Sequence, residues 1–133
     1  MAGMTALIVD KDLGFVFWLG QALDKAGYEA IPARDVGDAT KLLDELKADI
    51  DVLIVNPNLV GAQELIRTIR RSNQTVRVLA LMDSEDENTV TAQATDAIRV
   101  KPSHMDEIAR LEWIDAICRL TGPQYRTSAS HLG

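Results

Sequence analysis

The stretch IDVLIVNPNLVG, residues 50–61, decides the fold of this chain. Its run from Val52 to Val55 is apolar and rich in β-branched residues, which is typical of a buried strand. The run stops at Asn56-Pro57, because proline has no N–H group for a sheet and restricts the residue before it. In a parallel α/β sheet, binding sites form in the loops that follow the carboxyl ends of central strands. Position 56 is therefore a candidate functional residue, and its side chain is a neutral carboxamide.

Strands and helices are predicted to alternate on both sides of this stretch. Apolar runs of strand length lie at 5–9, 28–32, 76–82 and 97–100. Segments with helical period separate most of them, and Asp12 and Asp35 are predicted N-caps of the first two helices. The acidic segment 83–92 carries almost no apolar face, so at most a short or irregular fourth helix is expected there. The last helix is predicted from about Asp106 to Leu120, with an apolar stripe formed by Ile108, Leu111, Ile114, Ile117 and Cys118.

This alternation predicts a doubly wound α/β fold, in which five parallel strands in the order 2-1-3-4-5 carry helices on both faces, as in flavodoxin-like proteins. The domain is expected to span residues 4–121, and the polar tail 122–133 is expected to be disordered. The carboxyl ends of parallel strands meet at one edge of the sheet. The candidate site residues expected at that edge are Asp10, Lys11, Asp12, Asn56, Met82 and Lys101.

The composition excludes several classes of function. The chain has 133 residues and a net charge of −6, which disfavours binding to nucleic acid or to an anionic membrane. A single cysteine allows no internal disulfide, and no apolar run reaches the roughly 18 residues that span a bilayer. No glycine-rich nucleotide-binding motif occurs, and two isolated histidines make no zinc site. We therefore expect a cytoplasmic protein without cofactor or metal.

Three short motifs carry a resemblance to a known family. They are LIVD at 7–10, NPNLVG at 56–61 and VKP at 100–102. In this setting the chain resembles the response-regulator receiver domains of bacterial two-component signalling, over about residues 4–121. The resemblance implies a Mg²⁺-binding acidic pair after the first strand and a phosphorylated aspartate after the third. It also implies a Thr or Ser after the fourth strand and a lysine after the fifth, both of which contact the phosphoryl group.

The match is complete at only some of these positions. Asp10 stands where the first acidic residue belongs, Lys101 stands where the lysine belongs, and Asp12 fits a third acidic position that is common in the family. The segment between Met82 and Lys101 is about one helical turn shorter than the family pattern, which again places the fourth helix in question.

Four other positions depart from the family. Lys11 replaces the second acidic residue, Asn56 replaces the phosphoacceptor, Met82 replaces the hydroxyl residue, and Ile98 replaces a switchable aromatic. Phosphoryl transfer needs an anionic oxygen beside a metal ion, and a carboxamide carries no charge. The Lys11 ammonium would repel a divalent cation, since two unit charges about 4 Å apart interact by roughly 4 kcal/mol at an effective dielectric of 20. The resemblance therefore indicates an atypical receiver, or pseudo-receiver, that has lost phosphoryl chemistry.

These observations lead to one main hypothesis and two alternatives. The main hypothesis is a phosphorylation-independent protein-interaction module rather than an enzyme, which binds a protein partner or itself through the region after the fourth strand and the last helix. Lys11 or Lys101 would then pair with Asp10 or Asp12 in place of Mg²⁺. One alternative is a working receiver that is phosphorylated on Asp12 or Asp83. The other is a flavodoxin-like binder of a small ligand.

The tryptophan of the last helix, Trp113, has two readings. Core packing is the preferred one, and contact with a partner is the alternative, because the last helix borders the face that the resembling family uses for partners.

Overall fold

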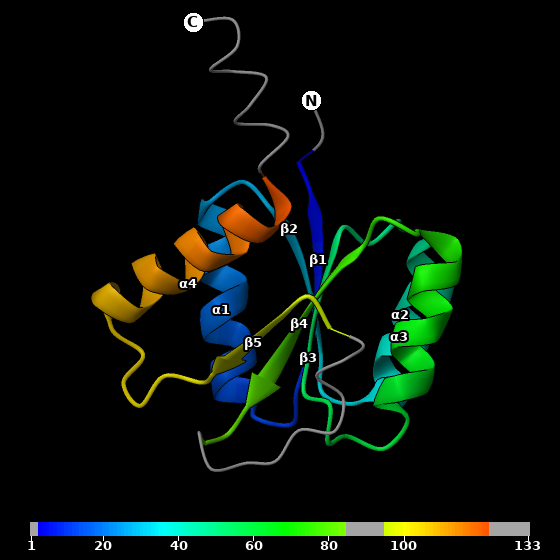
Figure 1. Cartoon of the computed structure of the whole chain (residues 1–133), viewed down its shortest axis with the longest axis horizontal. Helices are drawn as coiled ribbons and strands as arrows, with labels where there is room; N and C mark the ends of the chain where they lie inside the picture. The colour runs from blue at the N-terminus through cyan, green and yellow to red at the C-terminus, as the bar shows by residue number, and fades with distance from the viewer. Residues whose placement is uncertain (1–2, 85–94, 123–133) are drawn as a thin grey trace, which may run out of the picture.

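A computed structural model of the chain describes residues 3–84 and 95–122 (Figure 1). Its strands are β1 (Thr5–Val9), β2 (Glu29–Ala33), β3 (Val52–Val55), β4 (Arg77–Met82) and β5 (Ala97–Val100), and its helices are α1 (Leu13–Lys25), α2 (Val36–Leu46), α3 (Ala62–Ser72) and α4 (Glu107–Thr121). The strands form one parallel sheet in the order β2-β1-β3-β4-β5. The predicted fold class and strand order are confirmed.

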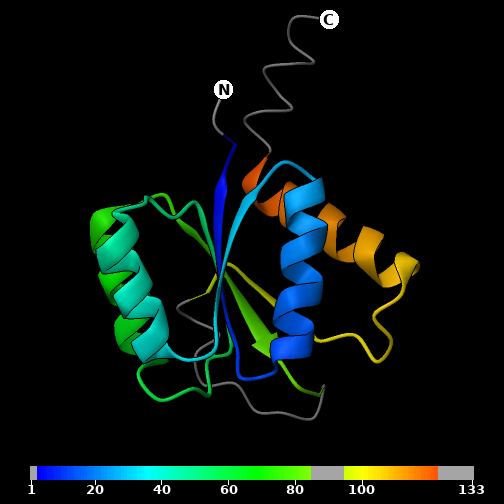
Figure 2. The ribbon, with the colours of Figure 1, turned by 180° about the vertical axis from the view of Figure 1, so that it is seen from behind.

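The sheet separates two layers of helices. Helices α1 and α4 cover one face, and α2 and α3 cover the other (Figures 1 and 2). Because successive residues of a strand point to opposite faces, Leu7 and Val9 of β1 pack with one apolar cluster while Ala6 and Ile8 pack with the other. Burial on both faces explains why the central strands are apolar throughout rather than alternating.

Local interactions explain the predicted helix N-caps and the need for glycine at position 61, the last residue of the stretch 50–61. The Asp12 carboxylate accepts a hydrogen bond from the Phe15 amide at 3.3 Å and so caps α1. Asp35 caps α2 in the same way. Gly61 precedes α3 with a φ of 86°, a conformation that side chains disfavour, and a Cβ there would lie 3.2 Å from Val36. Glycine at this position therefore allows the loop after β3 to turn closely past α2.

The inward face of α4 differs from the predicted apolar stripe. Ala109, Trp113 and Ile117 are buried, whereas Ile108 and Leu111 are 70% and 55% exposed. The helix carries apolar residues on two sides, so the helical period alone does not choose the buried side. The prediction that Ile108 and Leu111 face the core is wrong.

The size of Trp113 explains which side is buried. Its indole lies edge-on to the ring of Phe15 from α1, with ring centroids 5.3 Å apart. Such aromatic pairs bury a large apolar area with favourable ring geometry. Ile114 and Cys118 remain partly buried against the same cluster. The preferred reading of Trp113 as a core residue is confirmed.

Two predictions fall on other parts of the chain. Most of segment 83–92, where a short fourth helix was expected, and all but the first residue of tail 122–133 lie outside the described residues.

Among the helices within residues 3–84 and 95–122, none has both the length and the apolar character that crossing a membrane requires.

The two sides of α4 give a direct test of the packing. Trp113→Ala should lower the free energy of unfolding by about 3–5 kcal/mol, because it leaves a large cavity against Phe15. Ile108→Ala should change it by less than about 0.5 kcal/mol, as expected for an exposed position. Urea denaturation followed by far-ultraviolet circular dichroism measures both. Equal losses in the two variants would contradict the orientation of α4.

Candidate functional site

The carboxyl ends of four strands bring polar residues together at one edge of the sheet. Asp10 directly follows β1, Asn56 follows β3, Asp83 follows β4 and Lys101 follows β5. Backbone hydrogen bonds between neighbouring strands continue for one residue beyond the ends of β3 and β5. The Asn56 amide donates to the Val9 carbonyl at 3.0 Å, and the Lys101 amide donates to the Met82 carbonyl at 2.8 Å. The backbone from which each functional side chain projects is therefore held by the sheet itself.

The centre of the site is the carboxylate of Asp10, which is fully buried. Its Oδ1 accepts a hydrogen bond from Asn56 Nδ2 at 2.9 Å, and its Oδ2 accepts one from Lys101 Nζ at 2.7 Å. A buried carboxylate is tolerated only when it is paired and hydrogen-bonded, and here both oxygens have a partner. The structure thus brings the expected residues Asp10, Asn56 and Lys101 into direct contact.

The carboxamide of Asn56 is engaged at both ends. It is 2% exposed, and besides the bond to Asp10 its Oδ1 accepts from the Asn58 amide at 3.0 Å. The Asn56 carbonyl also accepts from the Leu59 amide at 3.2 Å. The side chain therefore closes a local turn of the kind that asparagine favours, and it ties the loop after β3 to the end of β1.

Lys101 bridges two carboxylates. Its side chain is 11% exposed, and its Nζ lies 2.7 Å from Asp10 and 2.5 Å from Asp83. Burial lowers the pKa of Lys101, but the hydrogen bonds to Asp10 and Asp83 outweigh it and leave the pKa above its usual range. The hydrogen bond from Lys101 lowers the pKa of Asp83 against a smaller opposing effect of burial. The Lys101–Asp83 pair is therefore fully charged at neutral pH.

The remaining expected residues lie around this centre. Lys11 is exposed and, within the described part of the chain, forms no ion pair, although its charge helps to lower the pKa of Asp83. Asp12 is turned to the amino end of α1, which it caps. Met82 is 9% exposed at the end of β4, and Ile98 is partly exposed on β5.

Of the expected pairings of Lys11 or Lys101 with Asp10 or Asp12, the structure contains the one between Lys101 and Asp10. The residue that sequence reasoning missed in this role is Asp83. It was considered only as an alternative phosphoacceptor and not as a partner of Lys101. Its position directly after a strand of the parallel sheet was the available signal, because that position places it at the same edge as Asp10 and Lys101.

The resemblance implies Mg²⁺, and the residues present do not fit it. Mg²⁺ requires near-octahedral oxygen ligands, usually including carboxylates. Both oxygens of Asp10 are already bonded, and the ammonium of Lys101 lies 2.7 Å from one of them. Within residues 3–84 and 95–122, no group of three His, Cys, Asp or Glu side chains is arranged to hold a metal ion.

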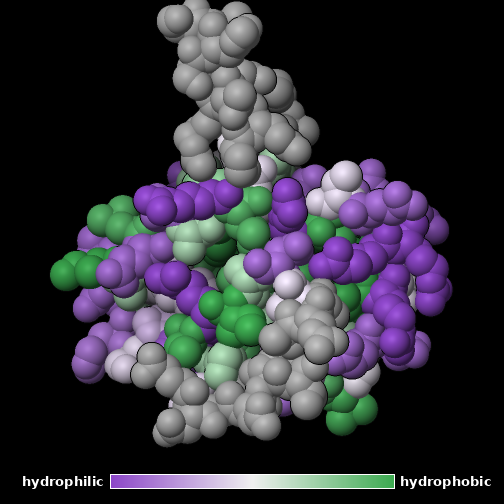
Figure 3. Space-filling model, in the orientation of Figure 1, coloured by the Kyte–Doolittle hydropathy of each residue, from purple (hydrophilic) through white to green (hydrophobic). Residues whose placement is uncertain are grey.

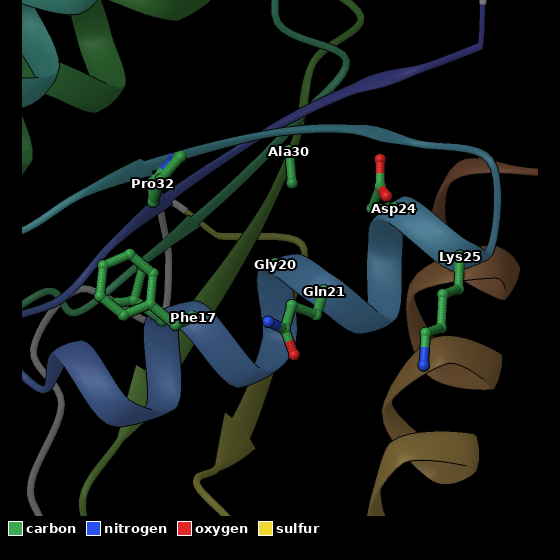
Figure 4. A pocket seen from close by; sticks show the side chains of 8 residues that line it. Phe17, Gly20, Gln21, Asp24, Lys25, Ala30 and Pro32 are labelled. Carbon is green, nitrogen blue, oxygen red and sulfur yellow. The ribbon is translucent and has the colours of Figure 1, made fainter.

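A separate hollow of about 600 Å³ lies on the outer side of α1, away from the site, beside the edge strand β2 (Figure 4). Gly20 and Ala30 leave room at its floor, and Phe17 stands at one end. The polar side chains of Gln21 and Asp24 lie along the helix side. No buried polar group faces this hollow among its lining residues, as a specific ligand site usually requires.

Comparison with known proteins places this geometry in context. No protein-family model matches the chain. It is 32% identical over 130 residues to the phosphate regulon transcriptional regulatory protein PhoB of Pseudomonas aeruginosa, covering 92% of this chain and 55% of PhoB. The chain therefore spans about half the length of this curated relative.

Solved structures agree on the fold. A response regulator from Thermotoga maritima has a TM-score of 0.67 at 24% identity, covering 88% of this chain and 98% of its own. The chemotaxis response regulator CheY4 of Vibrio cholerae has a TM-score of 0.65 at 22% identity, covering 86% of this chain and 98% of its own. The chain therefore has the fold of response-regulator receiver domains, and its sequence similarity to PhoB supports a place in that family.

Proposed function

We propose that this receiver domain is an atypical member that works in signalling as a protein-interaction module, in the cytoplasm and without phosphorylation. The observation that carries the proposal is the environment of Asn56. Its buried carboxamide occupies the end of β3 and is bonded to Asp10 on one side and to the Asn58 amide on the other. A neutral amide that is fully engaged in hydrogen bonds has no anionic oxygen with which to attack phosphorus.

The position of Lys101 supports the same proposal. A phosphoryl-transfer site needs a cation that neutralises the developing charge. Here an ammonium already lies between Asp10 and Asp83 and neutralises the buried carboxylate. Lys101 would act as an internal cation in place of Mg²⁺, and the site would keep its folded arrangement without a metal.

The proposed interaction surface consists of the outward side of α4 with β5. It is defined by Ile108, Leu111 and Ile98, which are exposed apolar residues. Figure 3 shows hydrophobic side chains gathered in the middle of the face between α4 and α3, while the side of α3 is mostly hydrophilic. Ile108 and Leu111 lie one turn apart on α4, and exposed apolar groups that are neighbours favour contact with another protein. A structural neighbour, the response regulator TrrA, has been solved in complex with the histidine kinase ThkA, so a protein partner is a natural expectation for this fold.

For the alternative of a working receiver, the structure favours Asp83 over Asp12 as the phosphorylated residue. If the domain is phosphorylated, Asp83 is the better acceptor, because its carboxylate is charged and adjoins Lys101. Asp12 is engaged in capping α1. A small-ligand binder would have to use the open hollow beside α1 and β2.

The first test is incubation with acetyl phosphate and Mg²⁺, followed by intact mass spectrometry. The proposal predicts that the wild-type chain gains no phosphoryl group, because the carboxamide of Asn56 is not a nucleophile. Asp12→Asn and Asp83→Asn serve as matched variants. A mass gain in the wild type that disappears in Asp83→Asn or in Asp12→Asn would replace the proposal by the alternative of a working receiver phosphorylated on that residue.

The second test concerns the interaction surface. Ile108→Ser combined with Leu111→Ser should leave the free energy of unfolding within about 1 kcal/mol of wild type, because both side chains are exposed. The same variant should abolish capture of partner proteins that the wild-type chain retains from a lysate. Leu46→Ser, at an exposed apolar position of α2, is the matched control. Equal capture by all three proteins would show that the outward side of α4 is not the interaction surface.

A further inference from the structure

We infer that Arg99 of β5 is the residue that receives a carboxylate of a partner protein, and that Trp113 holds it in position for this contact. The inference rests on the proposed function, because it names the chemistry of the partner that α4 and β5 would bind. It is carried by one orphaned donor. Among the side-chain nitrogen and oxygen atoms of the residues that the structure describes, Arg99 Nε is buried without a hydrogen-bond partner.

Arg99 lies on the face of the sheet that α1 and α4 cover. Successive strand residues point to opposite faces, and Ala97, two positions earlier, packs with the apolar cluster beneath these helices. The other strands contribute apolar side chains to the same cluster, among them Ile8, Ile54 and Leu81. A guanidinium at such a place is unfavourable, because it keeps its charge and loses part of its hydration. Packing alone therefore does not account for an arginine here.

The side chain of Arg99 is oriented by aromatic rings. Its Cζ lies 5.3 Å from the centroid of the Trp113 ring, a distance at which the indole attracts a cation. Trp113 is itself fixed by its edge-on contact with Phe15. The guanidinium is thus held in place before any partner arrives, and a contact that is already oriented loses less entropy on binding.

No carboxylate of residues 3–84 and 95–122 forms an ion pair with Arg99. Asp96, the acid that precedes β5, pairs with two arginines from other elements. Glu107 and Asp115 of α4 each pair with an arginine of that helix. Arg99 is therefore a partly buried cation whose neighbouring acids are engaged elsewhere, and a carboxylate from another molecule would complete it.

The surroundings of Arg99 favour an acidic side chain of a protein over a free small anion. Ile98, its neighbour in β5, and Ile108 of α4 are exposed apolar residues. A partner that covers them would also exclude water from the ion pair and so strengthen it. Arginine contacts that are surrounded by apolar residues are frequent centres of protein interfaces. The expected partner segment therefore carries Asp or Glu between apolar residues.

A simpler reading is that Arg99 only secures α4 through its contact with Trp113. That reading predicts that Arg99→Met lowers the thermal midpoint and leaves binding unchanged. Our inference predicts that the midpoint does not fall, because methionine still covers the indole and removes an unpaired charge and an orphaned donor. It predicts that binding of an acidic partner is lost.

The experiment uses the full chain and a synthetic helical peptide in which leucine and glutamate recur at helical spacing. A matched peptide has glutamine in place of glutamate. Titration is followed by the indole N–H signal of Trp113 in NMR spectra, which Trp18→Phe assigns. The glutamate peptide should shift this signal and bind at least about tenfold more tightly than the glutamine peptide. The net charge of −6 opposes this result, so a preference for glutamate reports a local cation.

Three variants make the outcome specific. Arg99→Met should weaken binding of the glutamate peptide by at least about tenfold and leave binding of the glutamine peptide unchanged. Lys41→Met, at an exposed position of α2, removes the same charge and should bind both peptides as the wild type does. Glu112→Gln removes an exposed acid beside Trp113 in the sequence and should not weaken binding, since that acid could only compete with the peptide.

The inference is overturned if the wild type does not distinguish the two peptides, or if Arg99→Met binds the glutamate peptide as tightly as the wild type. Both are measured below the thermal midpoint of each variant, so that unfolding does not imitate a loss of binding. A dimer of the wild type that Arg99→Met abolishes would assign the carboxylate to a second copy and overturn the assignment to a different protein.

Failure of this inference is distinct from failure of the proposed function. Peptide binding that depends on Ile108 and Leu111 but not on Arg99 would leave the interaction surface in place and contradict only the role of Arg99. Transfer of phosphoryl from acetyl phosphate to the wild-type chain would contradict phosphorylation independence, whatever the Arg99 variants show.

Discussion

The arrangement depends on the burial of one charge, the carboxylate of Asp10. An unpaired carboxylate in a protein interior is strongly unfavourable, so the surrounding residues must supply donors. Lys101 supplies a cation from the end of β5, and Asn56 supplies an amide from the end of β3. The three side chains join strands that lie far apart in the sequence, and their contacts are possible only because parallel strands end at the same edge of the sheet.

The same cluster touches the aromatic core. Lys101 Nζ lies 5.7 Å from the centroid of the Phe15 ring, and Phe15 packs edge-on against Trp113 of α4. The cation of the site is therefore in contact with the packing that orients the last helix. Since the proposed interaction surface lies on the outward side of that helix, site and surface share a continuous set of packed side chains. Because the Asp10–Lys101 cluster is hydrogen-bonded without a metal ion or a phosphoryl group, it would hold α4 in one orientation.

Much of the fold followed from the chain itself, because short apolar runs mark the buried central strands, one of which ends at Asn56-Pro57. The meeting of Asp10, Asn56 and Lys101 also followed, since it needs only the strand order. The buried face of α4 did not follow: Ile108 and Leu111 fit a helical stripe as well as Trp113 and Ile117 do, and tertiary packing chose between them. The contact between Asp83 and Lys101 was missed. The position of Asp83 directly after a predicted strand placed it at the same edge of the sheet, but the reach of its side chain to Lys101 does not follow from spacing along the chain.

The central claim is that the ammonium of Lys101 stands in for a metal ion beside Asp10. A crystal structure grown with Mg²⁺ and beryllofluoride tests it most directly, because both reagents would report a site that still accepts a metal and a phosphoryl analogue. The account predicts that Lys101 Nζ stays within hydrogen-bond distance of the Asp10 carboxylate and that neither reagent binds there. A Mg²⁺ ion coordinated by Asp10, with Lys101 displaced and beryllofluoride on a neighbouring carboxylate, would contradict it.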